Sequence, residues 1–128
     1  MYRAYGLLRP DSDFDLDEAG RRLAAKFPTD SVSRVGEQIT VTRGDWWIAV
    51  ALVSWPGIRD EIEGLVGRLA GLEPTEAETF VQSGRRVEVW TDVPDPFMEH
   101  FDDYLSVVEV LKSFRGLLAV DPKEPGIL

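Results

Sequence analysis

EQITVTRGDWWIAVALV, residues 37–53, is the stretch that decides the fold. In its first part Ile39 and Val41 alternate with polar residues, which is typical of a half-exposed strand. Residues 43–45, with the sequence RGD, supply a tight turn. Residues 46–53 are apolar on both faces, which predicts an inner strand covered above and below. The stretch therefore predicts a β-hairpin, and with it an antiparallel sheet in place of a doubly wound parallel one.

Three further segments have apolar residues at helical spacing, and they predict helices over about 16–27, 58–70 and 96–115. Asp15 and Glu18 form a capping box at the start of the first helix. Asp95 followed by a proline marks the start of the third. Residues 72–82 fit either a short helix or a strand.

The remaining strands are expected at residues 2–8, 85–92 and 117–120. The expected class is α+β, with an antiparallel or mixed sheet packed against about three helices. The leading β-α-β-β-α-β order is compatible with a ferredoxin-like split βαβ arrangement, extended by a C-terminal helix and a short strand. We expect a single domain over residues 1–128, in which 121–128 form a tail.

Composition excludes several kinds of site. The 128 residues include no cysteine and one histidine, which rules out disulfides, thiolate metal sites and a multi-histidine metal site within one chain. The acidic run that begins at Asp11 fails the EF-hand pattern, because the sixth and twelfth places hold Leu16 and Arg22. Phosphate-binding glycine loops and zinc-protease motifs are missing as well. No cofactor and no metal are expected.

The chain is strongly acidic, with a formal charge of −9 from 23 acidic and 14 basic residues. Such a surface repels nucleic acids and anionic membranes, so neither is an expected partner. It attracts a basic protein. The sequence shows no signal peptide and no stretch of about 20 apolar residues, and we expect a cytoplasmic protein.

Four residues are candidates for binding a partner. Trp55 and Trp90 lie at the end of one expected strand and on the mixed face of another. Tryptophans that reach the surface together make the kind of anchor that protein interfaces favour. Glu88 and Asp92, beside Trp90, would supply acidic contacts.

His100 and Asp103 are the candidate acid–base or pocket residues. His100 is the one side chain whose ordinary pKa lies near neutrality, and a carboxylate three residues later could orient it. No serine lies in a nucleophile elbow, so a Ser-His-Asp triad has no support. The sequence assigns no catalytic residue.

These observations favour a small, acidic, non-enzymatic protein-binding domain, for example an inhibitor or immunity-type protein that neutralises a basic partner. The alternative is a small-molecule-binding or enzymatic α+β domain with a pocket between sheet and helices. A homodimer formed through a sheet face or edge is compatible with both.

Overall fold

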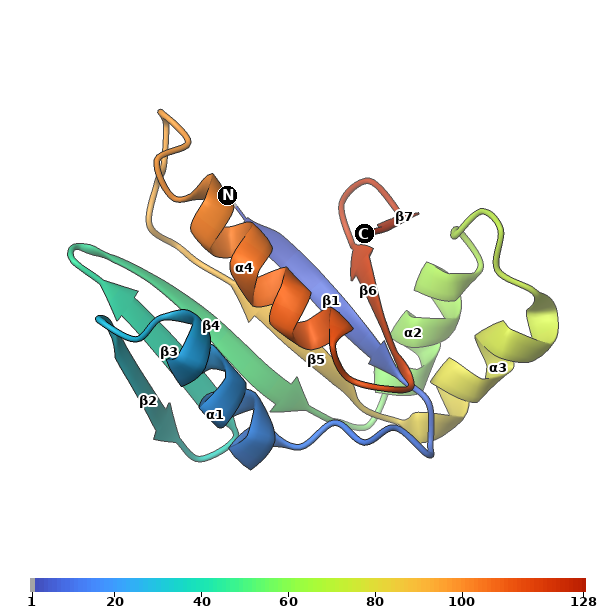
Figure 1. The fold of residues 1–128 in the computed structure, drawn as a ribbon. Coiled ribbons are helices and arrows are strands. Elements are labelled where there is room, and N and C mark those ends of the chain that lie inside the picture. Colours follow the sequence, from blue (N-terminus) through green and yellow to red (C-terminus); the bar gives the residue numbers. More distant parts are fainter. Residues whose placement is uncertain (1) are drawn as a thin grey trace.

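In the computed structural model, which describes residues 2–128, a sheet of seven strands separates two layers of helices (Figure 1). The strands are β1 (Arg3–Leu8), β2 (Ser31–Val35), β3 (Gln38–Arg43), β4 (Trp46–Val53), β5 (Arg86–Trp90), β6 (Leu117–Asp121) and β7 (Gly126–Ile127). The helices are α1 (Leu16–Lys26), α2 (Ile58–Val66), α3 (Pro74–Ser83) and α4 (Phe101–Lys112). The predicted α+β class is therefore confirmed.

The sheet has the order β2-β3-β4-β5-β1-β6-β7, and all its pairings are antiparallel. The ferredoxin-like order is not confirmed, because it would place β1 next to β4, whereas β5 lies between them. The difference lies after α2: the chain continues through α3 and returns as β5 directly beside β4, in an antiparallel pair, so that β1 is displaced by one position.

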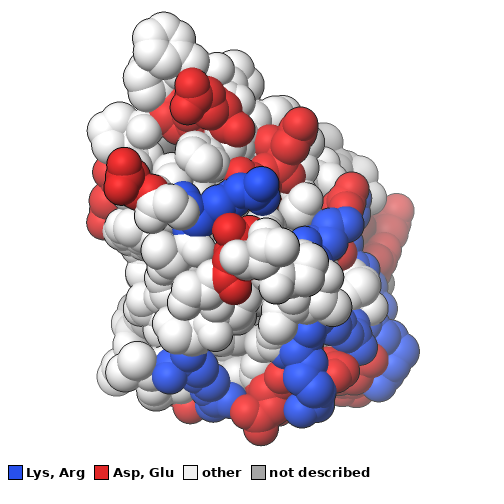
Figure 2. Space-filling view, turned by 60° about the vertical axis from the view of Figure 1, so that its left-hand side comes forward, with Lys and Arg blue, Asp and Glu red and all other residues white. Residues whose placement is uncertain are grey.

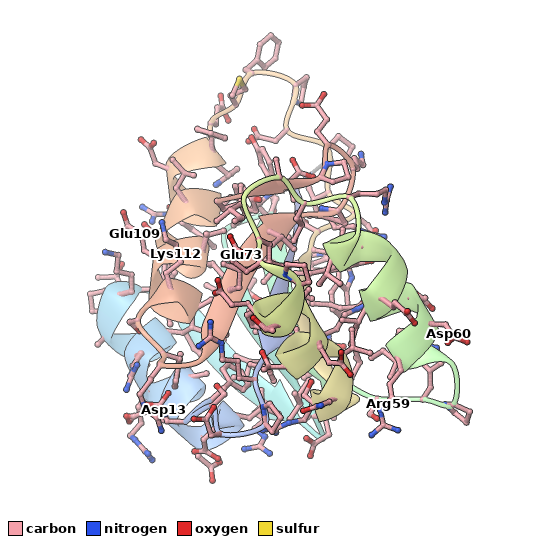
Figure 3. The ribbon with its side chains drawn as sticks, turned by 90° about the vertical axis from the view of Figure 1, so that its right-hand side faces the viewer. Asp13, Arg59, Asp60, Glu73, Glu109 and Lys112 are labelled. Carbon is pink, nitrogen blue, oxygen red and sulfur yellow. The ribbon has the colours of Figure 1, made fainter. Side chains whose placement is uncertain are left out.

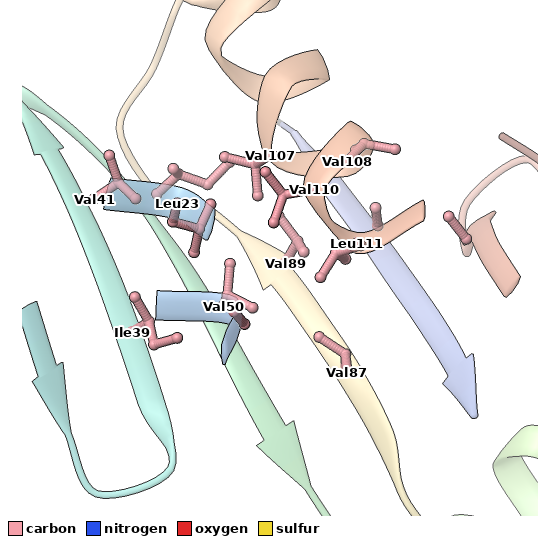
Figure 4. Close-up of a cluster of buried hydrophobic side chains, with 14 of the residues drawn as sticks. Leu23, Ile39, Val41, Val50, Val87, Val89, Val107, Val108, Val110 and Leu111 are labelled. Atoms are coloured by element: carbon pink, nitrogen blue, oxygen red, sulfur yellow. The ribbon is translucent and has the colours of Figure 1, made fainter. Parts of the chain in front are cut away.

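One face of the sheet is covered by α1 and α4. Asp15 caps α1 as predicted, since its carboxylate accepts a hydrogen bond of 3.0 Å from the backbone N–H of Glu18. Figure 4 shows Leu23 of α1 and Leu111 of α4 among the valines and isoleucines of β3, β4 and β5. This cluster is the larger of the two cores.

The other face carries α2 and α3, which bury the smaller core around Ile62 and Phe80. The ambiguous segment 72–82 is thus helical, and the chain has four helices in its described part where about three were expected. Pro74 occupies the first turn of α3, where a proline needs no backbone N–H. Gly84 ends the helix in the left-handed conformation, with φ of 65°.

That second face is covered only at one end. Val53 and Leu7 pack in the core under α2 and α3, but Ala49 belongs to neither core. Ala49 is nevertheless fully buried, because side chains of neighbouring strands shield it, including Trp90 directly opposite. Trp47 and Trp90 are half-buried on this open face. The expectation that β4 would be covered by helices on both faces is therefore only half right.

Two elements at the surface differ from expectation. The edge strand β2 was not predicted, since its sequence SVSRV is mostly polar and exposed. The third predicted helix, over 96–115, begins only at Phe101. Met98 has a positive φ of 56°, a left-handed conformation that ends any helix, and Phe97 is 84% exposed where the helix pattern had assigned it to a buried face. Every helix within residues 2–128 is too short or too polar to cross a bilayer.

We predict that Leu23→Ala lowers the free energy of unfolding by about 2–5 kcal/mol, because it leaves a cavity in the larger core. Leu105→Ala is the matched control: the same change in α4, at a side chain that is 40% exposed, should cost less than about 1 kcal/mol. Urea unfolding followed by circular dichroism measures both. Equal losses in the two variants would contradict the assignment of this core.

Candidate functional site

The most prominent surface feature is the loop of residues 91–100 between β5 and α4, which we call the apical loop. It projects from one end of the molecule (Figure 1). Phe97 and Met98 are 84% and 59% exposed, so an aromatic ring and a thioether chain face solvent there. Large exposed apolar side chains are a signal of binding when they are gathered in one place.

The apical loop is held in shape by the carboxylate of Asp95. Its two oxygens accept hydrogen bonds from the backbone N–H groups of Glu99, at 2.9 Å, and His100, at 2.8 Å. The backbone N–H of Met98 donates to the Asp95 carbonyl at 3.1 Å. Asp95 therefore caps backbone groups, as its N-cap pattern predicted, but it caps a turn and not the first turn of α4.

Asp95 is also tied to the start of β1. The hydroxyl of Tyr2 donates a hydrogen bond of 2.6 Å to the Asp95 carboxylate. Desolvation, followed by this hydrogen bond and the carboxylate charge, raises the pKa of Tyr2 to about 12. Desolvation alone would raise the pKa of Asp95, but the hydrogen bonds from Tyr2 and the two backbone N–H groups outweigh it and lower that pKa.

The structure brings the predicted pair His100 and Asp103 together. Nδ1 of His100 lies 2.8 Å from a carboxylate oxygen of Asp103. The imidazole stacks on the indole of Trp46, with ring centroids 4.5 Å apart and planes within 4°. Asp103 also accepts from Arg43 at 3.0 Å, and Arg43 reaches Asp30 at 3.7 Å. This network joins the turn before β4 to the start of α4.

A hollow of about 350 Å³ lies between that turn and the apical loop. Its lining is Arg43, Gly44, Asp45, Trp46, Val93, Pro94, Asp95, Pro96, Phe97, Glu99 and His100. None of these side chains is a hydroxyl, thiol or amine that could serve as a nucleophile. Within residues 2–128 no three side chains are grouped so as to hold a metal ion. The acid–base groups in its lining are the His100 imidazole and the carboxylates of Asp45, Asp95 and Glu99.

Charge at this end of the molecule is one-sided. Figure 2 shows Asp and Glu side chains gathered around the end from which the apical loop projects, with basic side chains among them. The turn before β4, the apical loop and the first turn of α4 together carry six carboxylates against one arginine: Asp45, Asp92, Asp95, Glu99, Asp102, Asp103 and Arg43. The apex is therefore acidic around an apolar tip.

The predicted partner-binding residues lie on β5 (Glu88, Trp90), in the loop after it (Asp92) and after β4 (Trp55). Trp55 and Glu88 surround the buried Arg86: Glu88 accepts from it at 2.8 Å, and the guanidinium lies 5.1 Å from the Trp55 ring. Trp90 is half-buried on the open face, roughly 13 Å further along the strand from position 86. Asp92 is exposed in the apical loop. The structure thus separates the two tryptophans and places only Asp92 at the apex.

Sequence reasoning missed Phe97 and Met98, and assigned Asp95 only as a helix cap. A signal was present in residues 94–100, PDPFMEH, because two prolines within three residues favour a constrained loop over a helix. The contact from Tyr2 has no such signal, since the two residues lie 93 positions apart.

Comparison with models of protein families, with curated proteins and with solved structures gives no match. The function of this chain is therefore inferred from its own residues.

We predict that Asp95→Asn lowers the pKa of Tyr2 from about 12 toward its ordinary 10.0, though not all the way, because desolvation remains. In the wild type the raised pKa stabilises the folded state fully below about pH 10, and this contribution is lost as pH rises through about 12. Nuclear magnetic resonance (NMR) titration of the tyrosine ring carbons measures the change.

Tyr104 is the internal control for this titration. Its pKa is raised by burial and then by Asp121, so Asp95→Asn should shift it much less than that of Tyr2, although the two rings stack with centroids 5.0 Å apart. An unaltered Tyr2 titration in the variant would contradict the role of Asp95 as its partner.

Proposed function

We propose that this chain is a non-enzymatic protein-binding domain whose apical loop binds a basic protein. The observation that carries the proposal is Phe97, 84% exposed at the tip of a loop that hydrogen bonds hold in one shape. An inhibitor or immunity-type protein that covers a functional surface of its partner is the concrete form that we favour.

The apex has the anatomy of an interface hot spot. Aromatic anchors surrounded by polar groups contribute most of the binding energy in protein complexes. Here Phe97 and Met98 form the apolar centre, and the exposed carboxylates of Asp45, Asp92, Glu99 and Asp102 form its rim. Because Asp95 already orders the loop, binding loses little conformational entropy, which raises affinity for a given contact area.

Charge selects the class of partner. The apical carboxylates contribute much of the formal charge of −9, so the field at the apex steers a cationic surface toward the apolar tip. The same field repels nucleic acids and anionic membranes, so neither is a proposed partner.

The second candidate function is acid–base chemistry on a small molecule, favoured by the 2.8 Å contact between His100 and Asp103 beside the hollow. Two features count against it. Asp103 is shared with Arg43, and the imidazole stacks on Trp46, so both groups have structural contacts that explain them. If an activity is found, His100→Gln must abolish it; an unchanged rate would remove His100 from the chemistry.

The test compares three forms of the tagged protein as baits for partners in lysate of the source cells: wild type, Phe97→Ala and Val35→Ala. Val35 is the matched control, because it is 82% exposed but lies in β2, paired with Gln38 at the end of the sheet away from the apex. We expect a basic protein to bind the wild type and the control, and to elute as salt rises.

With that protein purified, we expect Phe97→Ala to cost about 2 kcal/mol of binding free energy, a factor of about 30 in Kd. Val35→Ala should leave Kd unchanged, and raising salt from about 0.05 to 0.5 M should weaken the complex at least tenfold. Calorimetry measures each value. Equal binding by Phe97→Ala and wild type, or binding that salt does not weaken, would overturn the proposal.

A further inference from the structure

We propose that the hollow at the apex receives an arginine side chain of the bound partner. This inference rests on the proposed function and adds to it the residue that the partner presents. The hollow measures about 350 Å³, at the small end of the roughly 300–1,000 Å³ of ligand pockets, so a side chain suits it better than a large cofactor.

The charges in the hollow call for a cation. Asp45 and Glu99 line it, are exposed, and take part in no ion pair within residues 2–128. The one cation in the lining, Arg43, is already paired with Asp103 at 3.0 Å and Asp30 at 3.7 Å. Two carboxylates are therefore free to accept hydrogen bonds from a group that enters.

The walls select a guanidinium over an ammonium. Phe97 and the two prolines give the hollow apolar sides, whereas the Trp46 indole is 2% exposed and covered by the His100 ring. A guanidinium is planar, weakly hydrated and stacks on aromatic rings while its N–H groups reach carboxylates at the rim, whereas an ammonium is compact and strongly hydrated. An arginine can therefore contact the Phe97 ring and the carboxylates at once.

This chain uses the same chemistry for one of its own arginines. The Arg86 side chain is only 3% exposed, and its guanidinium lies 4.0 Å from the centre of the Tyr5 ring and 5.1 Å from that of Trp55. It donates to Glu88 at 2.8 Å and to Glu61 at 3.2 Å. Two aromatic rings and two carboxylates thus hold a guanidinium here. The apical hollow offers a similar but smaller set, one accessible aromatic ring (Phe97) and the two carboxylates of Asp45 and Glu99, unpaired within residues 2–128.

The test is an NMR titration of the full chain with N-acetyl-arginine amide. We expect saturable shifts confined to the backbone amides of residues 43–46 and 93–100. N-acetyl-citrulline amide, which has the same shape without the charge, should bind at least tenfold more weakly, and N-acetyl-lysine amide several-fold more weakly. Shifts elsewhere, or equal binding of citrulline or lysine, would overturn the assignment to arginine.

Two double variants test whether the arginine probe responds to the carboxylates of the hollow or only to the net charge of the protein. Asp45→Asn with Glu99→Gln should weaken the arginine probe at least fivefold. Asp60→Asn with Glu73→Gln changes the net charge equally, at exposed residues on the side of the molecule formed by α2 and α3, and should change nothing (Figure 3). If both double variants weaken binding of the arginine probe equally, the effect comes from net charge and the proposed site is wrong.

Failure of this inference is distinguishable from failure of the proposed function. If a basic partner needs Phe97 but the arginine probe does not bind, the arginine site is wrong and the apical interface stands. If the probe binds as expected but Phe97→Ala leaves the partner's Kd unchanged, the interface proposal falls and the arginine site remains as a property of the hollow.

Discussion

The position of β1 between β5 and β6 is the constraint on which the rest of the structure depends. At Gly6 a Cβ atom would lie 3.1 Å from the Leu117 side chain and 3.2 Å from that of Val87, so any larger residue there would push these neighbours aside. β1 contributes residues to the cores on both faces and therefore holds the two helical layers to one sheet. The residue before it, Tyr2, carries the hydroxyl that holds Asp95. The apical loop, which follows β5, is thus also anchored at the start of the neighbouring inner strand β1.

Aromatic rings and carboxylates gather at two places in the molecule, around Arg86 and at the apex. The same kinds of group contribute to stability at the first and are proposed to contribute to binding at the second. Around Arg86 the rings and glutamates are satisfied within the chain, and burial of the ion pair is offset by hydrogen bonds and stacking. At the apex Asp45 and Glu99 form no ion pair within residues 2–128, Phe97 is exposed, and Met98 beside it takes a left-handed backbone conformation. Local strain that surrounding contacts sustain is a common property of recognition loops.

Much of the fold could be predicted from local patterns, because those patterns report short-range physics. The hairpin over residues 37–53 and the cap at Asp15 depend on contacts within a few residues, and both were predicted. The strand order depends on which distant segments pair, which periodicity does not encode. At the candidate site, the His100 and Asp103 pair was predicted because it spans one helical turn. The exposure of Phe97 was not, since its apolar character fits a buried helix face equally well.

The two edge strands of the sheet, β2 and β7, differ in length. At one border the two-residue β7 and the hydrogen bond from the backbone N–H of Leu128 to the carbonyl of Ala119 close off β6. At the other, the five-residue β2 leaves a row of backbone donors and acceptors without a neighbouring strand in residues 2–128. A β-sheet aggregate grows only if each molecule has an unpaired edge strand on both sides of its sheet. Strand addition therefore has a five-residue edge to use on the β2 side and only a two-residue edge on the β7 side.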